Sequence, residues 1–245
     1  MNIERVWVKN FRLLSDVELD LESSSTLIVG RNNSGKTSLS EVIKRFLNSE
    51  TPFFPIEDFS LCCHDSFCNA LDEHLKKKNP EEVRKLIPAI ELKIRGSYKD
   101  HKDKMGPAAP FVIDIDPNSY EIIVIVRFAL KEGQLENFFE ECKQSDLDNA
   151  DRSELMRKLG EQIKACYSTS VLAVDPNDSS NHKEVDFASL KRLIKTDFIC
   201  AQRGLDDITS RESNVLAKVL EKLFTNANTE LSDKEDQQRN CPDRS

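Results

Sequence analysis

The sequence predicts an α/β fold built around a phosphate-binding loop that joins a strand to a helix. Residues 30–37 read Gly-Arg-Asn-Asn-Ser-Gly-Lys-Thr, a complete G-x-x-x-x-G-K-T motif. The apolar run 27–29 before the motif is suited to a short buried strand. Behind the motif, apolar residues recur at the spacing of an amphipathic helix: Leu39, Val42, Ile43, Phe46 and Leu47. Because strand, loop and helix follow in the order that phosphate binding requires, we expect the chain to bind a nucleoside triphosphate.

The residue types of the motif suit phosphate and magnesium binding. Glycines let backbone N–H groups approach phosphate oxygens, and the following helix directs its positive end toward them. We expect the Lys36 ammonium to reach the β- and γ-phosphates and the Thr37 hydroxyl to bind Mg²⁺. An ordinary glycine-containing turn is the alternative, and the predicted strand and helix on either side disfavour it. The predicted nucleotide-binding residues are Gly30, Arg31, Asn32, Asn33, Ser34, Gly35, Lys36, Thr37 and Ser38.

The rest of the first half predicts two strands, a loop and a further helix. Apolar and polar residues alternate over 3–8 and again over 17–21, which predicts an antiparallel pair leading into the strand of the phosphate loop. Residues 51–59 contain two prolines and predict a loop. A helix is predicted over 64–78, and Asn79-Pro80 is expected to end it.

The second half predicts a mixture of strands and helices. Dense β-branched and apolar residues predict strands over 89–98, 111–130 and 170–174. A stripe of apolar residues predicts a helix over 153–167, namely Leu155, Met156, Leu159 and Ile163. The remaining predicted elements are a helix over 134–144, a short strand over 197–201 and a final helix over 212–225.

Composition bounds the class of protein. The chain has 245 residues, a formal net charge of −8 and seven cysteines. No signal peptide and no apolar run of membrane-spanning length is visible, so we expect a cytoplasmic protein with no membrane partner. The acidic balance does not favour a continuous nucleic-acid-coating surface. The short basic runs at 76–78 and 99–104 are expected to be solvated helix ends or loops.

Three segments resemble the ATP-binding-cassette ATPases of the SMC and repair type, and most closely the overcoming-lysogenisation-defect (OLD) family. They are the strand ending in Lys9-Asn10-Phe11-Arg12, the loop 30–37 with Asn at its third position, and the run Phe198-Ile199-Cys200-Ala201-Gln202-Arg203. The resemblance implies a P-loop NTPase of the ABC/SMC-like type, with an antiparallel β part and the start of a helical lobe. It implies ATP and Mg²⁺ as cofactors.

The resemblance also implies a domain order and two further site residues. Residues 1–205 would form the ATPase N-lobe with a variable insert over about 61–185, residues 206–225 would begin the helical lobe, and 226–245 would be a polar, disordered tail. Gln202 would be the Q-loop glutamine, catalytic with Lys36 and in contact with Mg²⁺ together with Thr37. Its alternative is a polar residue capping a strand end. Arg12 would lie near the nucleotide or pair with an acidic neighbour, and we favour the pair.

Two motifs of such ATPases are missing from the sequence. No Ser/Gly-rich signature is visible, and the Walker B-like runs at 111–116 and 171–176 lack an Asp-Glu pair, with Pro176 standing where the second acid should be. We therefore expect the N-terminal part of a longer ATPase, with little or no activity in this chain alone.

The resemblance implies a homodimer through the ATPase head, with ATP binding and dimerisation gating action on DNA by a nuclease domain or partner, in phage defence or DNA repair. The alternative is an SMC-like structural or repair ATPase head without nuclease. A stand-alone phosphotransferase is disfavoured, because no Arg-rich lid is visible.

Two further residue groups have competing interpretations. Cys62-Cys63-His64 with Cys68 offers zinc-ligand chemistry, but the spacing favours buried cysteines at a helix start. A cluster of phenylalanines, namely Phe53, Phe54, Phe59 and Phe67, is expected to anchor the core rather than to stack on nucleic-acid bases.

Overall fold

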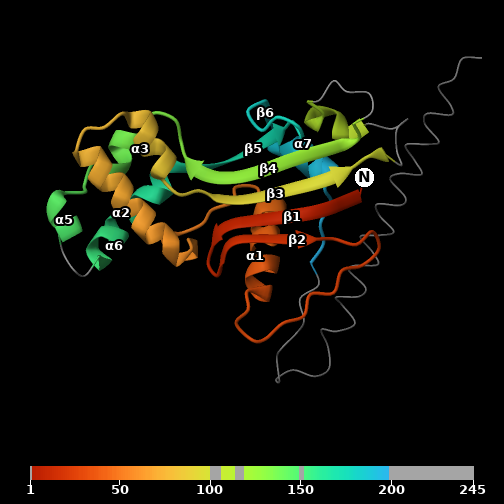
Figure 1. Ribbon diagram of the computed structural model, residues 1–245, viewed down its shortest axis with the longest axis horizontal. Helices are drawn as coiled ribbons and strands as arrows, with labels where there is room; N and C mark the ends of the chain where they lie inside the picture. The colour runs from red at the N-terminus through yellow and green to blue at the C-terminus, as the bar shows by residue number, and fades with distance from the viewer. Residues whose placement is uncertain (1, 100–105, 114–118, 149–151, 199–245) are drawn as a thin grey trace, which may run out of the picture. The chain divides into compact units, whose positions relative to one another are not determined.

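The computed structural model describes residues 2–99, 106–113, 119–148 and 152–198, and its centre is one antiparallel sheet. Six strands pair in the order β2-β1-β3-β4-β5-β6 (Figure 1). The strands are β1 Asn2–Phe11, β2 Leu14–Asp20, β3 Ile90–Ser97, β4 Glu121–Leu130, β5 Tyr167–Val174 and β6 His182–Val185. The predicted antiparallel pair over 3–21 is confirmed as β1 and β2, and the predicted strands 89–98 and 170–174 as β3 and β5.

Helices lie in separate places around the sheet. Most of them cluster beyond one end of β3 and β4, α1 lies by itself beside β1 and β2, and α7 packs on β5 and η3 (Figure 1). None of the described helices is both long and apolar enough to span a bilayer. The helices are α1 Lys36–Asn48, α2 Leu61–Leu75, α3 Pro80–Leu86, α4 Leu135–Phe139, α5 Gln144–Asp148, α6 Ser153–Cys166 and α7 Phe187–Leu193, with 3-10 turns η1 Ile56–Asp58 and η3 Gly106–Phe111.

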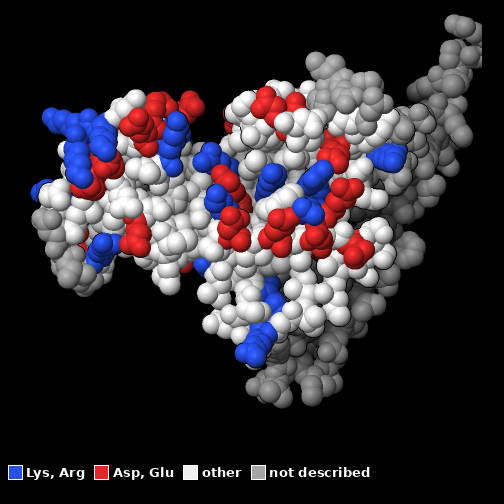
Figure 2. All heavy atoms as spheres, viewed as in Figure 1, with Lys and Arg blue, Asp and Glu red and all other residues white. Residues whose placement is uncertain are grey.

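One face of the sheet is covered with alternating charges. Figure 2 shows Lys and Arg beside Asp and Glu along the strands. Cross-strand pairs account for the pattern: Arg127 lies 2.8 Å from Glu91 and Arg95 lies 2.5 Å from Glu121. Glu91 and Arg127 are directly opposite in the register, and Arg95 and Glu121 are diagonal neighbours, so both pairs of opposite charges favour this register.

Several predicted elements differ in the structure. The helix predicted over 64–78 is α2 Leu61–Leu75, which ends at its C-cap Lys76 before Asn79-Pro80 is reached. Asn79 instead starts α3, because its side chain accepts a hydrogen bond from the Glu81 N–H at 3.0 Å. Residues 134–144 divide into α4 and the start of α5. The strand predicted over 111–130 begins only at Glu121, after the turn η3. The strand β6 and the helix α7 were not predicted. β6 is short and polar, whereas α7 with its C-cap carries a helical apolar spacing at Phe187, Leu190 and Ile194, which was an available signal.

Most elements predicted for the C-terminal part of the sequence lie outside the described residues. In the strand predicted over 197–201, Asp197 and Phe198 lie outside any strand, and the other three residues fall outside the described part. The predicted helix 212–225 and the polar tail 226–245 also lie outside it. The domain boundaries therefore remain predictions.

An aromatic cluster joins the sheet to the helices and loops. Phe128 on β4 lies 5.3 Å from Tyr167 and 5.4 Å from Phe54 between ring centroids. Phe59 contacts both Tyr167 and Phe67 of α2. The prediction of core anchors is confirmed, since Phe54, Phe59 and Phe67 are buried, and even the exposed Phe53 packs edge-on against Phe128. Burying these rings holds the loop 51–59 onto the sheet.

Removing the ring at the centre of this cluster is expected to destabilise the whole described unit. Phe128→Ala should lower the free energy of unfolding by about 3–5 kcal/mol, because a buried cavity would replace the ring. Phe53→Ala is the matched control: its side chain is 42% exposed, and it should cost about 1 kcal/mol or less. Urea unfolding of both variants measures the difference. Equal losses would contradict the central place of Phe128.

Candidate nucleotide-binding site

The phosphate motif forms the turn that leads into α1. Residues 21–35 run as a loop, and α1 begins at Lys36 with Gly35 as its N-cap in the left-handed conformation, φ 87°. Asn33 also has a positive φ of 63°. The Leu39 N–H donates to the Gly35 carbonyl at 2.8 Å, so the helix starts at the end of the motif. The N–H groups of its first turn have no acceptor inside the helix and are available to phosphate oxygens.

Lys36 folds back over its own loop. Its Nζ donates to the carbonyl oxygens of Gly30 at 2.6 Å and Arg31 at 2.5 Å, and lies 3.3 Å from the Ser34 Oγ. A Cβ added at Gly30 would lie 2.8 Å from that Oγ and 3.8 Å from the ammonium, so a side chain there would fill the cradle. The Lys36 ammonium, the free N–H groups of the first turn of α1 and Gly30, which has no side chain, thus lie together. This combination suits the binding of a polyphosphate. Thr37 is exposed on the first turn of α1, where its hydroxyl can reach a Mg²⁺ ion.

The strand predicted before the motif is wrong for the described structure. Residues 27–29 are an irregular segment, and Leu27 and Val29 are 85% and 82% exposed. No described strand pairs with this run, because β2 ends at Asp20 and the chain then leaves the sheet. The apolar pattern alone indicated burial, but a strand also needs a neighbouring strand to satisfy its backbone. The helix predicted after the motif is confirmed, with Leu39, Val42, Phe46 and Leu47 buried.

The turn between β1 and β2 supports the motif from one side. Gly35 lies against Leu14, and a Cβ on Gly35 would approach the Leu14 Cδ2 to 2.8 Å. Near the end of β1, before this turn, Asn10 adopts φ 63° and its side-chain amide donates to the Ala89 carbonyl at 2.8 Å. Phe11 is fully buried. Leu13 in the turn and Leu14 at the start of β2 are therefore the residues against which the phosphate motif packs.

A buried carboxylate connects this turn to α1. Asp58 of η1 is 4% exposed and receives the Arg12 Nε at 2.7 Å and an Arg45 guanidinium nitrogen. Arg45 also lies 2.7 Å from Glu41 on the same helix, and this hydrogen bond lowers the pKa of Glu41. The Arg12 backbone N–H donates to the Asp58 carbonyl at 2.8 Å. Of the two interpretations of Arg12, pairing with an acidic neighbour is the one observed.

Asp58, Glu41 and Arg45 were not singled out from the sequence. Asp58 lies in the segment 52–59, in which every residue except Glu57 and Asp58 is apolar or proline, so an acidic pair among apolar residues was the available signal. A carboxylate placed among aromatic residues needs cationic partners, and two arginines supply them. Their guanidinium groups also lie over rings, with Arg12 4.9 Å from Phe11 and Arg45 5.6 Å from Phe54.

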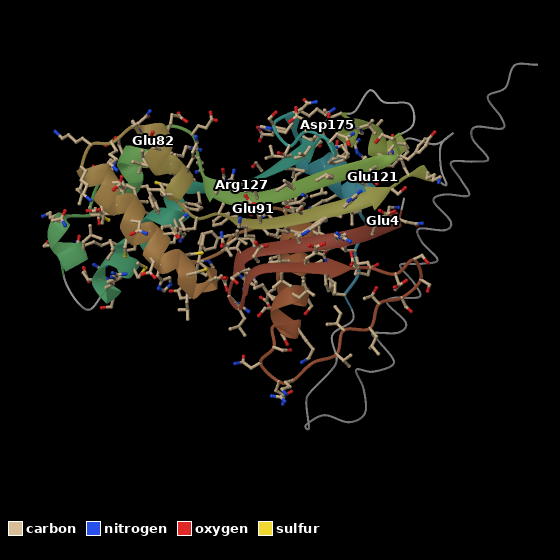
Figure 3. The ribbon with its side chains drawn as sticks, in the orientation of Figure 1. Glu4, Glu82, Glu91, Glu121, Arg127 and Asp175 are labelled. Carbon is tan, nitrogen blue, oxygen red and sulfur yellow. The ribbon has the colours of Figure 1, made fainter. Side chains whose placement is uncertain are left out.

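The other predicted site residues lie elsewhere. Asp175 closes the β5–β6 turn, where its carboxylate accepts the Asn177 N–H at 2.9 Å and the Asn181 amide at 3.0 Å (Figure 3). It serves the hairpin, so the Walker B-like run at 171–176 is a strand followed by a turn. The Walker B-like run at 111–116 begins where η3 ends, and its acids fall among residues that are not described. Gln202 also falls outside the described residues.

The cysteine cluster is only partly buried. Cys63 and Cys68 are buried on α2, as predicted, whereas Cys62 is exposed. Within the described ranges no three side chains of the His, Cys, Asp and Glu types come together as a possible metal site.

A G-x-x-x-x-G-K-T loop that opens a helix in an α/β fold is typical of P-loop nucleoside-triphosphate-binding domains. The family model described as AAA ATPase domain matches residues 1–244, and the chain belongs to this family. The predicted α/β P-loop fold with an antiparallel part is confirmed.

A solved structure is also similar, described in terms of ATP-driven dimerization and DNA stimulated activation of SMC ATPases. Its identity is 12% over 92% of this chain and 98% of that chain, with a TM-score of 0.38, a value too low to carry an argument. No curated protein matches the chain.

Gly35 should tolerate a side chain less well than another glycine of similar backbone. Gly35→Ala combines a left-handed backbone, costing about 1–2 kcal/mol, with a collision against Leu14 that adds about 1–3 kcal/mol. Gly133→Ala is the control, because its φ is 70° but nothing lies within 4 Å of its added Cβ. Chemical unfolding of both variants isolates the Leu14 contact. Equal destabilisation would show that Leu14 does not constrain the loop.

Neutralising Asp58 should loosen the base of α1. Asp58→Asn leaves two arginines without their shared carboxylate, and we expect a loss of about 2 kcal/mol, since the arginines are partly solvated. Asp65→Asn is the matched control: it breaks one exposed pair with Arg152 and should cost no more than about 0.5 kcal/mol. Thermal or urea unfolding compares them. If Asp58→Asn lowered the free energy of unfolding no more than Asp65→Asn does, the pairing of Asp58 with Arg12 and Arg45 would not hold α1 in place.

Proposed function

We propose that this chain is the ATP-binding N-terminal part of an OLD-like ATPase, in which ATP binding and dimerisation gate action on DNA in phage defence or DNA repair. The observation that carries the proposal is the complete phosphate loop closing on α1 with Lys36 inside it. Membership of the AAA ATPase domain family supports the ATPase part. The segments 9–12 and 30–37, which resemble the OLD family, support the rest.

ATP would be held by the motif as a whole. The first-turn N–H groups of α1 and the Lys36 ammonium would bind the β- and γ-phosphates, and Thr37 would hold Mg²⁺. When bound, Mg²⁺ neutralises charge on the phosphate oxygens. Lys36 would exchange its carbonyl partners for phosphate oxygens, which form stronger, charge-assisted hydrogen bonds. In this proposal the Lys36 side chain turns away from the two carbonyls when the nucleotide binds.

Hydrolysis of ATP needs groups in addition to the phosphate loop, Lys36 and Thr37, which form only half of a complete site. A water must be positioned and the developing charge stabilised, usually by residues outside the phosphate loop. Gln202 is our proposed contributor within the chain, and a second copy would supply the remainder across a homodimer. In this proposal residues 1–205 form the N-lobe, 206–225 begin a helical lobe, and the protein works in the cytoplasm.

The alternative function is an SMC-like structural or repair ATPase head without nuclease. The two candidates share the segments 9–12 and 30–37, so they differ in what happens to DNA rather than to ATP. Incubating the protein in its natural length with plasmid DNA, Mg²⁺ and ATP distinguishes them. Cleavage supports the OLD-like candidate, and ATP-dependent DNA binding without cleavage supports the SMC-like one.

Replacing the lysine of the motif should remove nucleotide binding. Lys36→Ala is expected to weaken ATP affinity at least about 100-fold, roughly 2.7 kcal/mol, while the fold stays intact. Lys44→Ala, an exposed lysine on the same helix, is the matched control and should bind like the parent. Calorimetric titration of ATP with Mg²⁺ measures affinity, and phosphate release is followed in parallel.

Each result of that titration has a distinct meaning. Binding with negligible phosphate release supports a half-site that needs further motifs. Steady turnover would show that a residue within the chain completes the site, and the half-site would be refuted. Retained affinity in Lys36→Ala would refute the assignment of the loop itself.

A further inference from the structure

A polar pocket lies where the sheet meets the helices, away from the phosphate motif in sequence. Its volume is about 310 Å³, and its walls come from the end of β1, the start of β3, the first turn of α2 and the end of α3. Three cationic side chains line it, namely Lys9, Lys85 and Arg127. Glu91 is the one carboxylate in the lining and pairs with Arg127 at 2.8 Å (Figure 3).

The cations of this pocket are only partly compensated. The register places Lys9, Glu91 and Arg127 directly across from one another on three neighbouring strands. Glu91 pairs with Arg127, and Asp16 of β2 stands across from Lys9 on its other side, but no ion pair is formed by Lys9 or Lys85 with the described residues. The positive end of the 15-residue helix α2, which has no acidic residue in its first turn, faces the same region. An anion entering the pocket would therefore be attracted.

The same pocket contains two adjacent thiols of opposite character. Cys62 and Cys63 both line it, and Cys62 is the exposed one. Burial, reinforced by the neighbouring Cys62, raises the pKa of Cys63 to about 12, so Cys63 stays protonated near neutral pH. The other described cysteines are also buried, and burial raises the pKa of each: Cys68, Cys142 and Cys166.

We propose that Cys62 is a modification site for anionic low-molecular-weight disulfides of the glutathione class, which the cations of this pocket attract. The Cys62 thiolate sulfur attacks one sulfur of the disulfide, a new S–S bond forms, and the old S–S bond breaks. The protein thiol is oxidised, and the released half is reduced and takes up a proton. Cys63 remains protonated and does not displace the adduct, so the mixed disulfide is the end product. This inference does not depend on the proposed ATPase function.

A pair of alkylating reagents of similar size but different charge tests the pocket. Iodoacetate is anionic and iodoacetamide is neutral, and both react with thiolates. For Cys62 we compare the rate of alkylation by iodoacetate divided by the rate of alkylation by iodoacetamide. This ratio should be about threefold to tenfold higher in the folded protein than in the urea-unfolded chain. Peptide mapping by mass spectrometry assigns the label to Cys62 rather than Cys63. Equal ratios in the folded and unfolded chains would overturn the proposal.

Charge variants identify the source of the preference. Lys9→Gln combined with Lys85→Gln should return the ratio to the unfolded value and slow mixed-disulfide formation with oxidised glutathione by a similar factor. Lys76→Gln combined with Lys78→Gln is the matched control, because these exposed lysines lie after the other end of α2 and pair with Asp72 and Glu73. The proposal would also be overturned if the preference for iodoacetate remained in the Lys9 and Lys85 double variant, or if it fell by the same factor in the control variant.

Discussion

The position of the phosphate loop depends on the buried carboxylate of Asp58. Arg12 from the β1–β2 turn and Arg45 from α1 both bind it, so two segments far apart in sequence meet on one charge. Removing charges from water is costly, and this cost is offset only while both arginines stay in place. Each guanidinium also lies over a ring of the aromatic core. The pairing of Asp58 with Arg12 and Arg45 therefore fixes the position of α1, which carries Lys36, relative to the sheet.

The two ends of the phosphate motif are held very differently. At the helix end, Gly35 packs on Leu14 and α1 buries its apolar face. At the other end, the segment before Gly30 leaves the sheet and exposes its apolar side chains. Lys36 is what closes the loop between them, through the carbonyls of Gly30 and Arg31. A nucleotide that draws Lys36 onto its phosphates would thus act on the less constrained half of the loop.

The charged face of the sheet and the polar pocket at its end differ in how their charges are paired. Along most of the charged face each arginine meets a carboxylate, so the surface is balanced (Figure 2). At the end of the sheet Lys9 stands across from Asp16 of β2 and Glu91 of β3 without forming an ion pair with either, and Lys85 of α3 forms none with the described residues. The unbalanced charge collects there, beside the exposed thiol of Cys62. Local pairing rather than the acidic total decides which surface attracts anions.

The sequence by itself determined the phosphate motif, the helix after it, the β1–β2 pair and the strands β3 and β5, because each has a local period or a fixed spacing of residue types. Only the tertiary structure decided what depends on distant neighbours. It left residues 27–29 unpaired and brought Arg12 and Arg45 to Asp58. Strand pairing and buried charge networks join segments dozens of residues apart, and a local pattern carries no information about that partner.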